Sequence, residues 1–379
     1  MQEPLDDLVT EVEQGRMSRR SFFEKALALG LSTQAAFALL PDAPVAAATR
    51  SSGTGPTPDV RTRKWRRGRG WGWVWDDDDE VGSLNELSGE LARKAMGLAG
   101  RGRVYDLGLL YDRRSFKFAG HSSGEIMTYR SPHGLRLQND IPPGPNSVAT
   151  AYASCHNSMS DNVATQIDTL GHIYIGDDPY AYNGWKADDI LGDYGLLKLG
   201  VETIPPIVAP ATLIDVAGFL GEEALPAGYA IQPDLLERVL DAQGVDVDVL
   251  DVVLVRTGTG GVWLRGGGVG ADIAAMEAHD PAGISVASAR WLVEQKGALM
   301  VGSDTSGLEV IPPVDRLPEG TSFNPVHVYL LNQQGVHILE LHNCEDLAAD
   351  RTYKFAYVLG PPQIKGNTAG TAMRPVGIG

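Results

Sequence analysis

Apolar positions divide the second half of the chain into short buried strands and amphipathic helices. Continuous apolar runs over 252–256, 299–302 and 336–341 predict strands of a sheet that is covered on both faces. Apolar residues three to four positions apart predict helices over 233–243, 287–296 and 326–334, and a glycine follows each of them. Because helices and strands interleave, the pattern predicts an α/β fold class.

One predicted strand carries polar side chains and runs into a loop. Side chains two positions apart share a face of a strand, so Gln166 and Asp168 should project together while Ile167 faces the core. His172 lies just past the end of this strand. The segment therefore places an amide, a carboxylate and an imidazole close together in the chain.

A second polar group lies about 160 residues later. His327 falls in the predicted helix, and Glu340 falls in the strand after it, where only Glu340 and His337 interrupt the apolar run. A buried carboxylate is costly unless it is paired or bound to a metal. The two polar segments predict either a split metal site or separate structural groups, such as a loop histidine, a turn acceptor and a buried ion pair.

The first polar segment resembles the signature of a known family. Residues 162–172 read NVATQIDTLGH, and the chain is similar to the cyclase family of metal-dependent hydrolases, whose signature is HxGTHxDxPxH. This family includes bacterial arylformamidases, isatin hydrolase and trans-dienelactone hydrolase. Thr165, Asp168 and His172 match the signature, whereas Asn162 and Gln166 stand where the family has histidines. These two differences from the family signature fall at positions where the family has metal ligands.

Further strings resemble the same family in the same order. They are WGWVWDDDDEVGSLN at 71–85, RTG at 256–258, GSDTSGLE at 302–309, and the closing segment 325–343. Together they span roughly residues 65 to 379. The resemblance implies a swivelling β/β/α arrangement in a single domain with a mixed β-sheet core, assembled as a homodimer or homotetramer.

The resemblance also implies roles for individual residues. Asp168, His327 and Glu340 correspond to metal ligands, and Gln166 is expected to add an amide oxygen. His172 is expected to act as the acid/base residue, with a ligand role as the alternative. Oxygen-rich ligand sets suit manganese, and zinc is the second expectation. His156, six residues before Asn162, is an alternative ligand that would replace one of the two histidines missing from the signature.

The expected reaction is hydrolysis of an amide or ester, within a ring or as an aryl amide. A divalent cation activates water and polarises a carbonyl, and an imidazole can move the proton. Tyr174, Tyr182 and Trp185 follow His172 and are expected to line the substrate pocket, although packing within their own loop is an alternative. A second hypothesis is an inactive exported small-molecule-binding protein with the same fold.

The amino terminus has the layout of a twin-arginine export signal. Ser18 to Lys25 carries the paired arginines, an apolar run follows over 26–40, and small residues end the segment at Ala48. The predicted organisation is a signal peptide over 1–48, a disordered linker over 49–69 and a hydrolase domain over 70–379. The expected location is periplasmic or extracellular, without a stable membrane span after cleavage, since the apolar run is short.

Composition limits the range of partners. The net charge of −16 disfavours nucleic acid as a partner and leaves a small-molecule substrate as the expected one. The basic run between residues 61 and 69 could contact an anionic cell wall, although a solvated tail is the simpler interpretation. Cys155 and Cys344 allow at most one disulfide.

Overall fold

The computed structural model describes residue 25 and residues 64–118, 120–121, 124–138, 144–266 and 273–379. The chain divides into two units, 1–59 and 60–379, and the description below concerns the second unit. The predicted signal peptide, except Lys25, and linker residues 49–63 lie outside the described residues. Within the described ranges, no helix has the length and apolar character that crossing a membrane requires.

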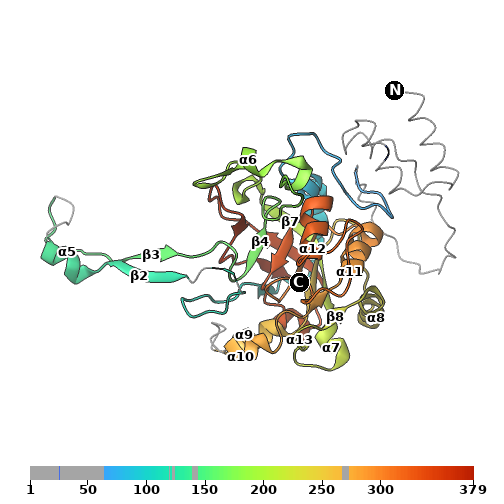
Figure 1. Ribbon diagram of the computed structural model, residues 1–379. Coiled ribbons are helices and arrows are strands. Elements are labelled where there is room, and N and C mark those ends of the chain that lie inside the picture. Colours follow the sequence, from blue (N-terminus) through green and yellow to red (C-terminus); the bar gives the residue numbers. More distant parts are fainter. Residues whose placement is uncertain (1–24, 26–63, 119, 122–123, 139–143, 267–272) are drawn as a thin grey trace. The chain divides into compact units, whose positions relative to one another are not determined.

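A mixed sheet forms the centre of the unit, as Figure 1 shows. In spatial order its nine described strands are β1 (Val104–Asp106), β15 (Val376–Ile378), β13 (Lys354–Leu359), β7 (Ile207–Asp215), β9 (Val252–Arg256), β11 (Met300–Ser303), β12 (Ile338–Glu340), β4 (Gln166–Asp168) and β14 (Ala369–Gly370). The strands from β7 to β12 are parallel, whereas β4 and β14 continue the sheet antiparallel. The predicted α/β class and mixed sheet are confirmed.

Helices connect the parallel strands and cover the sheet. The α-helices are α4 (Gly89–Gly97), α5 (Pro132–Gln138), α6 (Ala187–Ile190), α7 (Val216–Leu220), α8 (Pro233–Gln243), α9 (Thr259–Arg265), α10 (Ile273–Glu277), α11 (Val286–Arg290), α12 (Pro325–His327) and α13 (Glu345–Ala349). In the part of the chain that the structure describes, three short 3₁₀ segments are η1 (Gly82–Glu86), η2 (Tyr182–Gly184) and η3 (Val201–Thr203). Two π-helical segments, η4 (Trp291–Lys296) and η5 (Val328–Gln333), extend α11 and α12.

The predicted helices and strands agree closely with these bounds. The strand expected over 252–256 is β9 and the helix expected over 233–243 is α8, which begins at Pro233 and is followed by Gly244 in the left-handed region at φ 69°. The helices expected over 287–296 and 326–334 each change from α to π geometry part-way. The elements exist where the apolar periodicity places them.

One buried carboxylate joins two of the strings on which the sequence resemblance rests. Asp304, just after β11, accepts hydrogen bonds from the backbone N–H groups of Thr257 and Gly258 at 2.8 Å and of Gly260 at 3.2 Å. Gly258 has φ 90°, a conformation that favours glycine. The RTG string therefore forms the turn after β9, and Asp304 holds it in place.

The segment before residue 70 packs on the domain. Trp65 donates its indole N–H to the Val293 carbonyl at 2.7 Å, and the Gly68 N–H donates to the Glu294 carbonyl at 2.7 Å. Trp65 is one of the partly buried residues against the main core. The packed region therefore begins before the predicted domain start at residue 70.

A hairpin stands apart from the main sheet. Strands β2 (Glu125–Arg130) and β3 (Ser154–Ser158) pair only with each other among the described strands, and Figure 1 shows them with α5 extending away from the central sheet. The remaining small sheets are β8 (Ala230–Ile231) with β10 (Gly283–Ile284), and β5 (Leu191–Gly192) with β6 (Gly195–Leu196).

Candidate metal centre

The antiparallel pairing of β4 with β12 places three polar side chains on one face of the sheet. Gln166 lies directly opposite Glu340, and Asp168 lies opposite Ile338. Side chains on one strand alternate between faces, so Asp168 shares the face of Gln166 and Glu340. Gln166, Asp168 and Glu340 are all buried. The predicted shared face of Gln166 and Asp168 is confirmed by the hydrogen bond between their side chains.

His327, at the junction of α12 and η5, enters this face from the helical side. Its Nε2 lies 3.3 Å from Glu340 Oε1 and 3.7 Å from Asp168 Oδ2. Its other ring nitrogen, Nδ1, lies 2.5 Å from Glu309 Oε1. Because Glu309 keeps a proton on Nδ1, Nε2 is the ring nitrogen that faces Asp168 and Glu340.

Glu309 is a site residue that the sequence did not reveal. Its carboxylate also accepts the backbone N–H groups of Val326 and His327, at 3.0 and 3.1 Å. These bonds fix the start of α12 and the His327 ring together. The signal was present in the chain, because Glu309 ends the string 302–309, but no spacing links it to His327.

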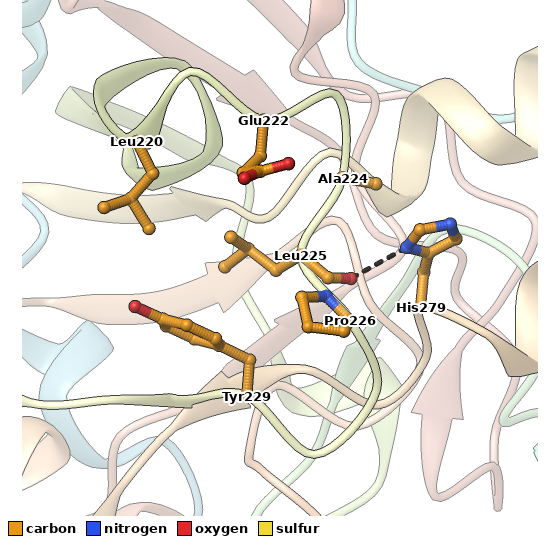
Figure 2. A pocket seen from close by; sticks show the side chains of 7 residues that line it. All are labelled: Leu220, Glu222, Ala224, Leu225, Pro226, Tyr229 and His279. Atoms are coloured by element: carbon orange, nitrogen blue, oxygen red, sulfur yellow. Dashed lines mark hydrogen bonds between the residues drawn. The ribbon is translucent and has the colours of Figure 1, made fainter.

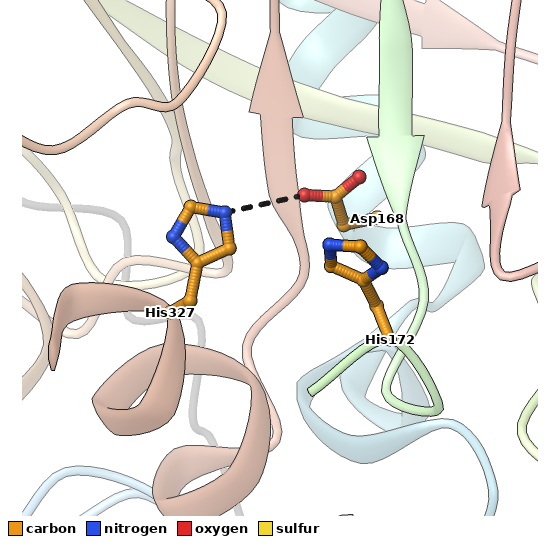
Figure 3. Close-up of side chains that lie close together, drawn as sticks. All are labelled: Asp168, His172 and His327. Carbon is orange, nitrogen blue, oxygen red and sulfur yellow. Dashed lines mark ion pairs between the residues drawn. The ribbon is translucent and has the colours of Figure 1, made fainter. Parts of the chain in front are cut away.

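His172 completes a cluster that could hold a cation. One ligand atom each from Asp168, His172 and His327 lies within 4.8 Å of the others. The His172 and His327 ring centroids are 6.1 Å apart. Figure 3 shows Asp168 at the end of β4, His172 on the loop that follows, and His327 on the facing helix. Strand, loop and helix thus bring together residues from two distant parts of the chain.

Burial changes the protonation of each group. Burial raises the pKa of Asp168 to about 6, against the opposing effect of His327, and burial with the neighbouring Asp168 raises the pKa of Glu340 to about 8. Burial and the nearby His327 lower the pKa of His172 to about 3. Despite its burial, His327 has a pKa well above its usual range because Glu309 and Glu340 face it.

The residues fit a divalent cation. Asp168 Oδ2 is buried and has no hydrogen-bond partner among the described residues, which is costly for a carboxylate. Three carboxylates, from Asp168, Glu309 and Glu340, surround the single His327 ring. A cation beside Asp168 Oδ2 would supply the missing partner and offset the negative charge.

Comparison with known proteins decides the family. The model of the Cyclase family ("Putative cyclase") matches residues 105–310, more than half of the chain. The chain belongs to the Cyclase family. Among curated proteins, none matched it.

Solved structures agree with this membership. The crystal structure of a novel cyclase is 26% identical, with a TM-score of 0.67, and the match covers 80% of this chain and 96% of that one. Isatin hydrolase A from Ralstonia solanacearum is 19% identical, with a TM-score of 0.50, and the match covers 77% and 97%. An isatin hydrolase bound to the product analogue thioisatinate is 17% identical, again with a TM-score of 0.50, covering 77% and 98%. These similarities confirm the cyclase-like fold expected from the sequence.

The three aromatic residues after His172 have different surroundings in this Cyclase-family chain. Tyr182 is fully buried, and its hydroxyl donates to Asp79 Oδ2 at 2.8 Å. The Trp185 indole N–H donates to the Asp79 carbonyl at 3.3 Å. Tyr174 is partly buried, and its hydroxyl has no hydrogen-bond partner among the described residues. Of the three, Tyr174 alone has a polar group without a hydrogen-bond partner among the described residues, and the pocket role of all three stays a prediction.

The other residues considered as site candidates lie elsewhere. His156 is on β3 of the separate hairpin and does not belong to the described metal cluster. Cys155 is exposed on the same strand, whereas Cys344 is buried, and both are free thiols. His156 is therefore not positioned as the substitute ligand that its spacing left open.

A pocket of about 540 Å³ lies among loops on another part of the unit, as Figure 2 shows. Its lining is mostly apolar, with His279 and Glu222 as its titratable side chains apart from Tyr229. His279 Nδ1 lies 2.8 Å from the Leu225 carbonyl oxygen, so that nitrogen carries the proton. The lining includes no member of the metal cluster, and the pocket holds no arrangement of catalytic groups.

Removing the metal should make stability depend on pH. Asp168 and Glu340 titrate near pH 6 and 8 when folded, above their ordinary values of 3.8 and 4.5, so the folded state binds more protons. The unfolding free energy of chelator-treated protein should therefore fall as pH rises through this window. The raised pKa of His327 acts in the same direction, because its stabilising protonated form is lost as pH rises.

The measurement is the melting temperature with and without metal, between about pH 5 and about pH 9. We expect a decline of several degrees for the metal-free protein and a nearly constant value for the loaded protein. A melting temperature of the metal-free protein that rises over this range would contradict the assignment of buried, uncompensated carboxylates.

Replacing Glu309 with alanine should weaken metal binding by about 10-fold to 100-fold, because the His327 ring loses the carboxylate that orients it. The dissociation constant can be measured by competition with a chelating dye. Glu222→Ala, a carboxylate change in the separate pocket, is the control and should leave the constant unchanged. Equal dissociation constants for Glu309→Ala and the parent protein would show that Glu309 does not contribute to metal binding.

Proposed function

We propose that the protein is a metal-dependent hydrolase that opens a cyclic amide, a lactone or an aryl amide by attack of water. The observation that carries the proposal is the cluster of buried Asp168, partly buried His172 and buried His327, in which Asp168 Oδ2 has no hydrogen-bond partner among the described residues. Family membership supports the same reaction class. Manganese is the proposed cation, and zinc is the alternative, because carboxylate oxygens contribute most of the donor atoms.

Asp168, His327 and Glu340 are proposed to hold the cation, since their Oδ2, Nε2 and Oε1 atoms face one another. A divalent cation bound there lowers the pKa of a water molecule and polarises a carbonyl oxygen. Glu309 keeps the proton on His327 Nδ1 and so keeps Nε2 available. Burial of the carboxylates excludes bulk water from one side of the reaction.

His172 is proposed to move the proton. Its pKa of about 3 keeps the imidazole neutral at physiological pH, and a base this weak would take a proton only from water whose own pKa a bound cation had lowered. The same low pKa makes the protonated ring short-lived, so the proton passes readily to the leaving nitrogen or oxygen. His172 thus serves first as base and then as acid.

The proposed substrate has a planar ring. Tyr174 and Trp185 lie on the loop that follows His172, and each is partly buried beside the core. Isatin, the substrate named for two of the similar structures, is a planar cyclic amide. A flat ring of this size would suit aromatic walls.

Hydrolysis assays test the proposal. The purified protein, loaded with manganese or zinc, would be offered isatin-like cyclic amides, aromatic lactones and aryl formamides. We expect hydrolysis that requires metal, is lost in Asp168→Ala and is retained in Asp178→Ala, a control carboxylate in the same loop that is exposed and paired with Lys186. Tight binding of these compounds without turnover would instead support the inactive binding protein.

We also propose export by the twin-arginine route to the periplasm or the cell exterior, on the basis of residues 18–48 alone. Changing Arg19 and Arg20 together to lysine should retain the protein in the cytoplasm. Fractionation of cells that express both forms measures this. Equal export of the two forms would exclude the route.

A further inference from the structure

The side-chain amide nitrogen of Gln166 lies among three oxygen atoms. Its Nε2 lies 2.8 Å from Glu340 Oε2, 3.0 Å from Asp168 Oδ1 and 3.5 Å from Asn162 Oδ1. Two of these atoms belong to carboxyl groups, which only accept hydrogen bonds once a bound cation ionises them, so the atom between them is then the NH₂ group rather than the amide oxygen. Gln166 therefore donates to both carboxylates at once.

The sheet and a neighbouring loop fix this arrangement. Gln166 and Glu340 are directly opposite in the β4–β12 pairing, so the short distance between them follows from strand register. Asn162 donates its own NH₂ group to Asp161 Oδ1 and to Thr368 Oγ1, both at 3.0 Å. Its carbonyl oxygen is thereby turned towards Gln166.

The Gln166 amide keeps this orientation although it leaves its oxygen without a partner. Gln166 Oε1 is buried and accepts no hydrogen bond from the described residues. A buried unpaired acceptor costs free energy, and rotating the amide by half a turn would instead place Oε1 against two carboxylate oxygens. Hydrogen bonding to the two carboxylates therefore decides how the amide lies.

Each of the two carboxylates contacts the Gln166 amide with one oxygen and faces His327 with the other. One oxygen of Asp168 and one of Glu340 contact the amide, while Asp168 Oδ2 and Glu340 Oε1 lie on the side of His327. A group of three oxygens that includes two carboxylates is a place where a cation would bind. Here a neutral N–H donor fills that place, and its hydrogens repel a cation.

We infer that Gln166 is a positioning residue that takes the place of one cation and limits the centre to a single divalent ion on the His327 side. This inference rests on the proposed function, and it replaces the sequence expectation that Gln166 is itself a ligand. The amide holds Asp168 and Glu340 together without a second charge. Their free oxygens stay aimed at the one remaining position.

Metal stoichiometry tests the inference. The full-length protein and its variants would be equilibrated with excess manganese, separated from free metal by gel filtration and measured by elemental mass spectrometry. We expect about one equivalent for the unchanged protein. Gln166→His places an imidazole nitrogen among the three oxygens, a four-donor set, and should bind about two equivalents. Electron paramagnetic resonance should then show coupling between the two manganese ions, a signal that does not depend on activity.

A second variant covers the case in which the histidine variant does not fold. Gln166→Met has similar length but no N–H donor, so it should keep about one equivalent while binding it more weakly. Two equivalents in the unchanged protein would overturn the inference and leave the proposed function standing. One equivalent in folded Gln166→His, or unweakened binding in Gln166→Met, would also overturn it. Absence of metal from the unchanged protein would overturn the proposed function and the inference together.

Discussion

Replacing His172 with alanine is expected to lower the hydrolysis rate by about 10²-fold to 10⁴-fold while the protein keeps its bound metal. The reason is that the variant loses the neutral imidazole beside Asp168 and His327 but keeps the three atoms proposed to hold the cation. The turnover number at neutral pH and the metal content of the same sample measure the two effects separately.

His156→Ala is the matched control, because His156 is on the separate β2–β3 hairpin. It should leave both turnover and metal content unchanged. Loss of metal from His172→Ala would show that His172 is a ligand. Unchanged turnover would show that His172 takes no part in the reaction.

Replacing Arg256 with methionine is expected to lower the free energy of unfolding by about 3–5 kcal/mol. Arg256 Nη1 donates to Asp215 at 2.8 Å, and its Nε and Nη2 donate to Glu345 at 2.9 and 2.8 Å. These two carboxylates raise the pKa of the guanidinium despite its burial. The variant leaves Asp215 and Glu345 without their shared cation.

Urea unfolding of the metal-loaded protein measures this change. Arg374→Met is the matched control, because Arg374 is exposed and pairs with the partly exposed Asp106, and its removal should leave the midpoint nearly unchanged. A midpoint for Arg256→Met equal to that of the control would show that the buried ion pairs contribute little net stability.

The main elements could be predicted because their periodicity is strong. The apolar run of β9 and the amphipathic spacing of α8 each have one simple interpretation, and both elements have the predicted bounds. The change from α to π geometry at His327 could not be predicted. Apolar residues cover the same face of the helix in either geometry, and only the tertiary contacts of α12 and η5 distinguish them.

The site could be predicted only in part. Asp168, His172 and His327 were found from residue type and resemblance, and the structure brings all three together. Glu309 was missed because its role depends on how the loop before α12 returns to His327. The orientation of the Gln166 amide could not be predicted either, since it depends on strand register and on a hydrogen bond to Glu340, which is distant in the sequence.

The aromatic residues show a similar limit. Tyr182 follows His172 closely, yet it contacts Asp79 of the acidic run, about 100 residues earlier in the chain. Asp79 also accepts the backbone N–H of Gly82 and the side chain of Asn85. Proximity in sequence therefore said little about which aromatic side chain faces a substrate.

Asp168, together with His327 and Glu340, is proposed to hold a divalent cation. Elemental mass spectrometry of the purified protein with the metal it acquires in its own cells, compared with Asp168→Ala and the control Asp178→Ala, tests this proposal. We expect about one equivalent of manganese or zinc in the unchanged protein and the control, and none in Asp168→Ala. Metal-free protein in all three samples, or the same metal content in Asp168→Ala, would contradict it.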